Sequence, residues 1–130
     1  MRFEYKNFPF LGEASTLAAE AVLCAADQGQ FWPYHDTVFA NQGTLFEPGT
    51  DYRRALKQMA KMLALDTRAF NRCFNGRVHR QDVQQELADG RARGVESTPT
   101  VFVNDVNLGY PESFEEIQRV IEEELAKASQ

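Results

Sequence analysis

Apolar residues along this chain recur mainly at helical spacing, with strand-like alternation in a few short runs. Spacing of three or four residues places apolar side chains on one face of a helix, whereas alternation places them on one face of a strand. The pattern predicts helices at Ala14–Gln28, Phe31–Asn41, Asp51–Leu65 and Val78–Arg93, a short helix that Asp66 caps and Gly76 ends, and a last helix after Ser113. It predicts strands at Met1–Phe8, Thr100–Asn104 and about Asn107–Tyr110.

Two of these helices carry further signals in the sequence. The helix at Ala14–Gln28 is apolar almost all round and is followed by Gly29, which predicts a helix buried between others that stops at the glycine. The last helix opens with the capping-box pattern Ser-Phe-Glu-Glu at Ser113. We expect that helix to bury four apolar residues, Phe114, Ile117, Ile121 and Leu125.

The composition limits the number of domains and the classes of partner, but it does not indicate a function. The 130 residues suit one domain, and 43% of them are hydrophobic, as in globular proteins. Fourteen basic and nineteen acidic residues give a net charge of −5 without a basic cluster, so we expect no nucleic-acid partner. The longest apolar run, Ala21–Ala26, is too short to cross a membrane, and the first residues do not form a signal peptide. The chain as written would stay in the cytoplasm unless a leader has been removed, so the sequence leaves its compartment open.

The segment Gly94–Asn104 is the most informative motif. It places Pro99 directly before an apolar, β-branched run, where a proline is tolerated because it occupies the first position of a strand. Bonds that precede proline are also the ones in which a cis peptide is cheap.

Three segments in order resemble the DsbA-like branch of the thioredoxin superfamily: Arg2–Phe10, Ala18–Trp32 and Gly94–Asn104. The resemblance implies an α/β (α+β-like) class, a truncated thioredoxin fold with a large helical insertion and a small sheet of about three strands. On this basis residues 1–130 form a single domain, in which 12–93 are the insertion and 1–10 and 94–130 are the thioredoxin-like remainder.

The resemblance also assigns roles. It implies a cis peptide between Thr98 and Pro99, beside which an extended peptide or protein ligand would bind. In that family, which is mostly extracytoplasmic, a strand and a Cys-x-x-Cys helix precede the segment that resembles Arg2–Phe8. This chain contains no Cys-x-x-Cys, so we expect it to lack that front part, and no catalytic residue can be assigned.

The chain has two cysteines, Cys24 and Cys73, with 48 residues between them. Neither sits at a helix N-terminus, where a reactive thiolate would be stabilised. Two buried free thiols and a disulfide both fit the residues, and the resemblance favours a structural disulfide. With His35 and His79 they do not show the short ligand spacing of a zinc site, so we expect no metal and no cofactor.

Two functions follow as expectations. The first is a non-catalytic binding or structural module that uses the cis-proline edge, so that the chain alone is not an enzyme. The alternative is an incomplete thiol–disulfide oxidoreductase, whose catalytic strand and Cys-x-x-Cys helix come from a missing N-terminal segment or a partner chain. Because the central strand would be absent, we expect a homodimer through exposed strand edges.

Overall fold

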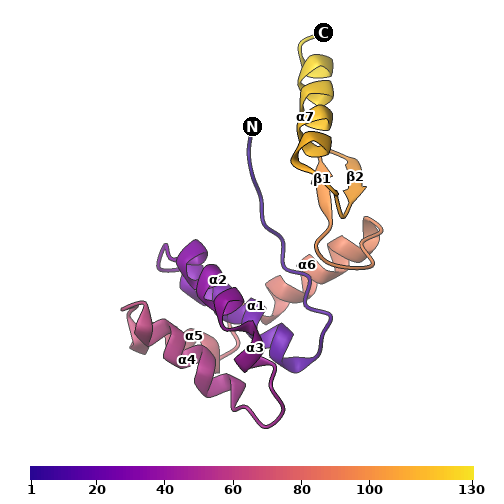
Figure 1. The fold of residues 1–130 in the computed structure, drawn as a ribbon. Coiled ribbons are helices and arrows are strands. Elements are labelled where there is room, and N and C mark those ends of the chain that lie inside the picture. The colour runs from indigo at the N-terminus through magenta and orange to yellow at the C-terminus, as the bar shows by residue number, and fades with distance from the viewer. The chain divides into compact units, whose positions relative to one another are not determined.

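A computed structural model of the protein describes residues 1–130, which divide into two compact units, Met1–Ala88 and Asp89–Gln130 (Figure 1). The elements in chain order are α1 (Glu13–Ala26), α2 (Phe31–Ala40), α3 (Gln42–Leu45), α4 (Tyr52–Met62), α5 (Thr67–Asn75), α6 (Arg80–Ala92), β1 (Val101–Val103), β2 (Val106–Gly109) and α7 (Phe114–Ala128). The predicted helices are confirmed within a few residues at their ends, and the segment expected to be a loop after α2 contains the one-turn helix α3. The predicted division into a helical insertion, 12–93, and a thioredoxin-like remainder stays a prediction.

The core of the first unit forms around α1. This helix contacts α2, α4 and α5, and it buries seven of its side chains, as its nearly all-apolar sequence predicted. Large buried residues from all four helices meet there: Leu17, Tyr34, Leu56, Phe70 and Phe74. Burying each such side chain contributes about 1.5–3 kcal/mol, so this cluster holds the four helices together.

Side chains cap several helices where the sequence indicates. Asp51 and Asp66 accept hydrogen bonds from the backbone N–H groups of Arg54 and Ala69, and thereby begin α4 and α5. Ser113 accepts one from the N–H of Glu116, so half of the predicted capping box is formed. The other half differs, because the Glu116 carboxylate accepts from the N–H of Glu112.

The end of α5 differs from the prediction in one residue. Gly76 has φ −78°, so it is not left-handed; the left-handed residue is Arg77, with φ 50°. The N–H groups of Arg77 and Val78 donate to the carbonyls of Phe74 and Cys73, which is the hydrogen-bond pattern of a Schellman motif. An arginine therefore occupies the position that usually favours glycine.

The predicted strand at Met1–Phe8 is wrong. Residues 1–10 contain neither helix nor strand and form no backbone ladder. Side chains anchor the segment instead: the N–H and Nδ2 of Asn7 both donate to Glu86 Oε2, at 3.2 and 2.8 Å, and the ring of Tyr5 packs against Phe31 and His35. The alternation suits a strand, but a strand also needs a partner to pair with, and the described residues supply none.

The second unit contains the antiparallel pair β1–β2 and helix α7, which contacts β1. The sheet therefore has two strands rather than about three, within a mixed class of helices and a small sheet as expected. The expected buried face of α7 is wrong: Phe114 is 72% exposed, Leu125 is exposed, and Val120 is the buried residue. A two-stranded sheet offers too little surface to cover the whole apolar face of a fifteen-residue helix.

No helix in the structure combines the length and the apolar character needed to cross a bilayer.

Candidate functional site

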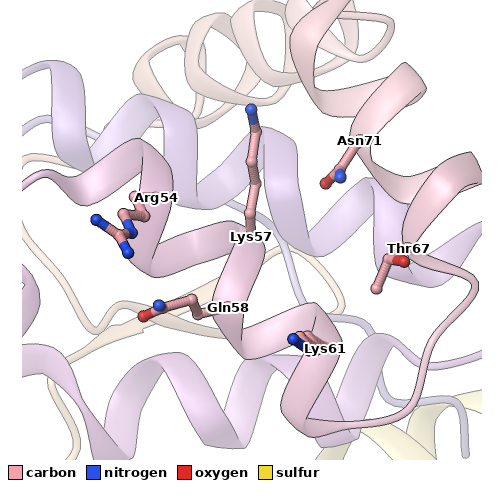
Figure 2. Close-up of a pocket in the computed structure, with 6 residues that line it drawn as sticks. All are labelled: Arg54, Lys57, Gln58, Lys61, Thr67 and Asn71. Carbon is pink, nitrogen blue, oxygen red and sulfur yellow. The ribbon is translucent and has the colours of Figure 1, made fainter.

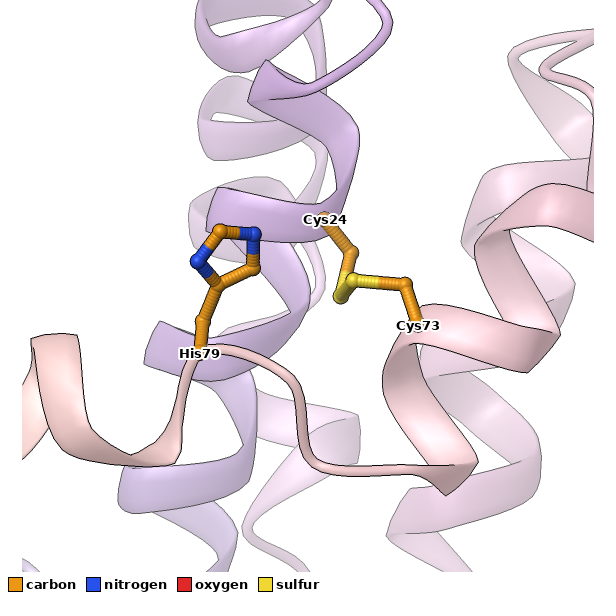
Figure 3. Close-up of side chains that lie close together, drawn as sticks. All are labelled: Cys24, Cys73 and His79. Carbon is orange, nitrogen blue, oxygen red and sulfur yellow. A yellow bond between two sulfur atoms is a disulfide. The ribbon is translucent and has the colours of Figure 1, made fainter.

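Cys24 and Cys73 form a disulfide between α1 and α5, with their Cα atoms 5.9 Å apart (Figure 3). Both cysteines lie near the C-terminal ends of their helices. Figure 3 shows the ring of His79, from the segment that joins α5 to α6, beside the bridge. We call these three residues, together with Asp27 and Asp82, the disulfide site.

The sequence brings His79 to this position through the end of α5. The left-handed Arg77 turns the chain back, so that Val78 bonds to the carbonyl of Cys73 and His79 follows within two residues of that turn. His79 then precedes α6, and its carbonyl accepts the N–H of Val83. Asp82 is in the first turn of α6, three residues after His79, which places both side chains on one face.

His79 lies between two carboxylates. Its Nε2 is 2.7 Å from Asp27 Oδ2 and its Nδ1 is 2.7 Å from Asp82 Oδ2. Carboxylates are acceptors, so both contacts are hydrogen bonds only when both ring nitrogens carry a proton. Burial alone lowers the pKa of His79, but the hydrogen bonds and charges of Asp27 and Asp82 outweigh it and raise the pKa above its ordinary value. The geometry therefore favours the imidazolium form.

Asp27 also faces the bridge. Its Oδ2 lies 3.8 Å from Cys73 Sγ, which is a contact and not a hydrogen bond because a disulfide sulfur carries no proton. The C-terminal ends of α1 and α5 add partial negative charge at the same place. These negative groups oppose a free thiolate on Cys73 and favour the imidazolium of His79, whose positive charge in turn compensates part of their effect on the sulfur.

The ligand-type atoms of Cys24, Cys73 and His79 lie within 4.8 Å of one another. Cys24 is buried, while Cys73 and His79 are partly accessible. A depression of about 380 Å³ borders the site, lined by Leu23, His79, Asp82, Gln85 and Glu86. Small molecules and ions can therefore approach His79 from solvent.

Sequence reasoning identified part of this site. The pairing of Cys24 with Cys73, which the resemblance favoured, is present. The sequence pattern addressed His79 only as a zinc ligand, by its spacing from the cysteines, and it did not point to Asp27 or Asp82. Two local signals were available. Asp27 follows Cys24 by three residues and Asp82 follows His79 by three, so each acidic residue lies one turn from a residue of the site.

The loop predicted to bind substrate lies in the second unit. The Thr98–Pro99 peptide is cis, and both residues are exposed. Thr98 makes no hydrogen bond within the chain, and the hydroxyl of Thr100 donates to the carbonyl of Ser97 at 2.6 Å. Next to this loop the guanidinium of Arg93 stacks over the ring of Phe102, 3.8 Å from its centre, and covers the apolar side chain of β1.

A second depression, of about 300 Å³, lies between α4 and α5 (Figure 2). Its lining includes Arg54, Lys57 and Lys61, none of which has a carboxylate partner, and Asn71, whose buried Oδ1 has no hydrogen-bond partner. The local charge favours anions. No residue of this depression belongs to a site that the sequence predicted.

Comparison with known proteins identifies the family. A family model described as Thioredoxin matches residues 1–123, nearly the whole chain. The chain belongs to the thioredoxin family. The expected truncated thioredoxin fold, in its DsbA-like form, is therefore confirmed at the level of family and fold class.

The relatives of this thioredoxin-family chain fall into two groups. "Probable disulfide bond formation protein D" of Bacillus anthracis is 27% identical over 124 residues, which are 93% of this chain and 56% of the relative. "Disulfide bond formation protein D" of Bacillus subtilis (strain 168) is 25% identical over 132 residues, 96% of this chain and 57% of the relative. "Na(+)/H(+) antiporter NhaA" of Herminiimonas arsenicoxydans is 36% identical over 92 residues, 71% of this chain but only 14% of the antiporter. The chain thus spans little more than half the length of the first of these relatives, and no solved structure matches it.

These findings correct the expected function. Two relatives that match 93% and 96% of this chain are named for disulfide bond formation, and the two cysteines present are joined in a disulfide. The expectation of a non-catalytic binding or structural module is therefore wrong. The findings favour the alternative, an incomplete thiol–disulfide oxidoreductase whose catalytic strand and Cys-x-x-Cys helix come from a missing N-terminal segment or a partner chain.

Proposed function

We propose that this chain is the substrate-facing part of a thiol–disulfide oxidoreductase, whose reacting Cys-x-x-Cys is carried by a segment outside these 130 residues. One observation carries the proposal: the thioredoxin family match covers residues 1–123, and relatives over the same range are named disulfide bond formation proteins. Neither Cys24 nor Cys73 has another cysteine within three residues, so the vicinal pair must come from a preceding segment or from a partner chain.

The reaction is thiol–disulfide exchange. A thiolate of the substrate attacks one sulfur of the oxidised Cys-x-x-Cys and releases the other as a thiolate, which forms a mixed disulfide. A second thiolate of the substrate then attacks the substrate sulfur of that mixed disulfide. The substrate gains a disulfide, and the Cys-x-x-Cys gains the two electrons and is left as a dithiol.

The part that we assign to this chain is binding the substrate. The backbone of Thr98, which precedes Pro99, is exposed and makes no hydrogen bond within the chain. A free N–H and C=O at the start of a strand suit pairing with the extended backbone of a peptide. This pairing holds the thiol of the substrate near the reacting disulfide without requiring a particular substrate sequence.

We assign the Cys24–Cys73 disulfide a structural role in this reaction. Cys24 is 2% exposed, so an incoming thiolate cannot reach its sulfur. Attack on Cys73 would require a second negative charge beside Asp27. Both barriers slow exchange at this bridge, so a substrate reacts at the Cys-x-x-Cys, whereas a strong dithiol reductant can still attack the partly accessible Cys73.

A chimera tests the proposal. A strand followed by a Cys-x-x-Cys helix, as in a complete thioredoxin fold, is fused before Met1, and the oxidised chimera is mixed with a peptide that contains two thiols. We expect the chimera to oxidise the peptide, as measured by loss of free thiol. A matched chimera with Ser-x-x-Ser and the unfused chain should both be inactive.

Two results would contradict this function. A folded chimera without activity would show that the chain cannot complete such a site. Activity of the unfused chain that disappears in C73S would assign the chemistry to the Cys24–Cys73 bridge instead.

The source of the Cys-x-x-Cys is tested separately. The genomic DNA before the Met1 codon is read in frame for two cysteine codons separated by two others. Finding them places the reacting pair in the same polypeptide. If they are absent, affinity purification of the chain from its own cells should recover a partner with that motif.

A further inference from the structure

We propose that the disulfide site becomes a zinc site when the disulfide is reduced. The four ligands are Cys24 Sγ, Cys73 Sγ, His79 Nε2 and an oxygen of the Asp27 carboxylate. This inference rests on the geometry of the first unit alone and is independent of the proposed function.

The ligand set is suited to zinc. Two thiolates, one imidazole and one carboxylate are ligand types that Zn²⁺ binds in tetrahedral sites. The spacing of cysteines and histidines in the sequence argued against such a site, but the fold supplies the proximity, since the sulfur and nitrogen atoms already lie within 4.8 Å of one another. Asp27 Oδ2 is close to both groups, 2.7 Å from His79 Nε2 and 3.8 Å from Cys73 Sγ.

The distances require little movement. With Zn–S bonds of about 2.3 Å and a Zn–N bond of about 2.0 Å, tetrahedral ligands lie about 3.3–3.8 Å apart. Shifts of about 1 Å in the side chains bring the sulfur and nitrogen atoms to these separations. The two sulfurs must move apart, and the Cα separation of 5.9 Å between Cys24 and Cys73 allows this by rotation of the side chains.

Asp82 supplies the support that a zinc-bound histidine usually has. Its Oδ2 accepts a hydrogen bond from His79 Nδ1 at 2.7 Å, which leaves Nε2 as the nitrogen that faces Asp27 and the sulfurs. A carboxylate on the outer nitrogen fixes the ring and increases its basicity, and such partners affect metal affinity by about 10- to 100-fold. This contact is already formed before any metal binds.

The charges of the site explain why the reduced cysteines are expected to bind zinc and not to remain as a pair of free thiolates. Asp27, Asp82 and the C-terminal ends of α1 and α5 disfavour additional negative charge. A divalent cation neutralises two thiolates, so the same surroundings that oppose the free thiolates favour the bound metal. The depression beside His79 provides a path for the ion.

The reaction balances with a dithiol as the reductant. The dithiol transfers two electrons and two protons to the Cys24–Cys73 bridge and becomes a disulfide, which leaves two thiols. Zinc binding then releases the two thiol protons and the Nε2 proton of His79 to solvent. Re-oxidation uses a disulfide as the oxidant: it takes up the two electrons of the thiolates and two protons from solvent and becomes a dithiol, while the Cys24–Cys73 bond forms and the zinc is released. The site therefore alternates between two cross-links of α1 to α5.

The test uses the full chain without an affinity tag, because histidine tags bind zinc. The protein is reduced with dithiothreitol, which is removed under anaerobic conditions because it also binds zinc. Zinc is titrated in competition with a chromophoric chelator, and cobalt(II) is used in a parallel titration to report tetrahedral thiolate coordination by its absorption. We expect one metal ion per reduced chain and none for the oxidised chain.

Variants separate this site from adventitious binding. H79A and D27N should weaken zinc binding at least tenfold, and D82N should weaken it about 10- to 100-fold through the outer hydrogen bond. H35A is the matched control, because His35 also bonds to a neighbouring aspartate, Asp36, but has no sulfur nearby. It should bind zinc as the unmodified chain does.

If reduction unfolds the chain, the far-ultraviolet circular dichroism signal of its helices is measured before and after zinc is added. Zinc should then restore the helical signal of the unmodified chain and of H35A but not of H79A. Equal affinity of the oxidised and reduced chains, or of H79A and H35A, would overturn the proposal, as would a reduced chain that zinc leaves unfolded.

Discussion

Arg77 Nε and Nη2 donate to the two carboxylate oxygens of Glu20, at 3.1 and 2.7 Å, and so join the end of α5 to the middle of α1. The side chain of Glu20 is 1% exposed, whereas the side chain of Arg77 is 32% exposed and keeps contact with water. A buried carboxylate is stable in this core because both of its oxygens are paired. Arg77 holds the pair from a left-handed backbone position, with φ 50°.

Removal of the guanidinium should destabilise the first unit. In R77A the carboxylate of Glu20 stays buried without a partner, so we expect the free energy of unfolding to fall by about 3 kcal/mol. Urea denaturation at pH 7 measures this change. R72A is the control, because Arg72 is exposed in the last turn of α5 and makes no ion pair, and it should change the free energy of unfolding by less than about 0.5 kcal/mol.

A second prediction rests on the left-handed backbone conformation of Arg77, which has φ 50°. R77G loses the same ion pair as R77A, but glycine adopts a positive φ without the clash of a Cβ atom. We therefore expect R77G to be more stable than R77A by about 1 kcal/mol in the same denaturation experiment. Equal stabilities of the two variants would show that position 77 carries no backbone strain.

The disulfide should contribute a large share of the stability of the helical unit. Cys24 and Cys73 are separated by 49 positions, and closing a loop of that length stabilises a protein by about 4 kcal/mol on the chain-entropy model. The double variant C24A/C73A, measured with a chelator present to exclude metal effects, should lose about this amount. A loss below about 1 kcal/mol would mean that the unfolded chain without the bond already keeps the segments around positions 24 and 73 close together.

Local signals in the sequence predicted the helices, because caps and apolar faces are encoded within a few residues. Asp66 and Ser113 cap the helices that they were expected to cap. The alternation in Met1–Phe8 is equally local, but a strand forms only where another strand pairs with it, and the described residues provide none. The expected burial of Phe114 fails for the same reason, since it depends on a covering surface that local spacing cannot indicate.

The residues of the candidate site also fall into two groups, those that the sequence points to and those that only the tertiary structure brings together. The two cysteines and the turn at Pro99 are visible in the sequence, and the resemblance to a known family related each of them to a role. The position of His79 between Asp27 and Asp82 is tertiary: it follows from the turn at Arg77 and from the packing of α5 against α1. Spacing along the chain does not record that proximity.

The expected homodimer stays a prediction, and the two-stranded sheet gives it a physical basis. In such a sheet β1 and β2 each keep one unpaired edge, and unpaired edges favour pairing with a second chain. Light scattering at micromolar concentration should give twice the mass of one 14.8 kDa chain. V106K places a charge on an exposed residue of β2 and should favour monomers, whereas E122K on α7 should not. A mass of one chain for the unmodified protein would contradict the dimer.

Stability at alkaline pH should depend on Tyr34. Its side chain is fully buried, and its hydroxyl donates to the carbonyl of Leu56 at 2.8 Å. Burial raises the pKa of Tyr34 well above its ordinary value, whereas a tyrosine in the unfolded chain ionises near pH 10. Above about pH 10 the unfolded state therefore releases a proton that the folded state keeps, so the stability that is fully present below pH 10 falls as the pH rises.

Y34F isolates this contribution. At pH 7 the variant lacks the hydrogen bond to Leu56 and should be less stable by about 1 kcal/mol. Between about pH 9 and 11 its stability should fall less steeply than that of the unmodified chain, because phenylalanine has no proton to release in the unfolded state. Urea denaturation across this range measures both slopes, and Y110F, which alters an exposed ring, is the control. Parallel pH profiles for the unmodified chain and Y34F would contradict the prediction, because they would mean that the folded state gives up the Tyr34 proton as readily as the unfolded state does.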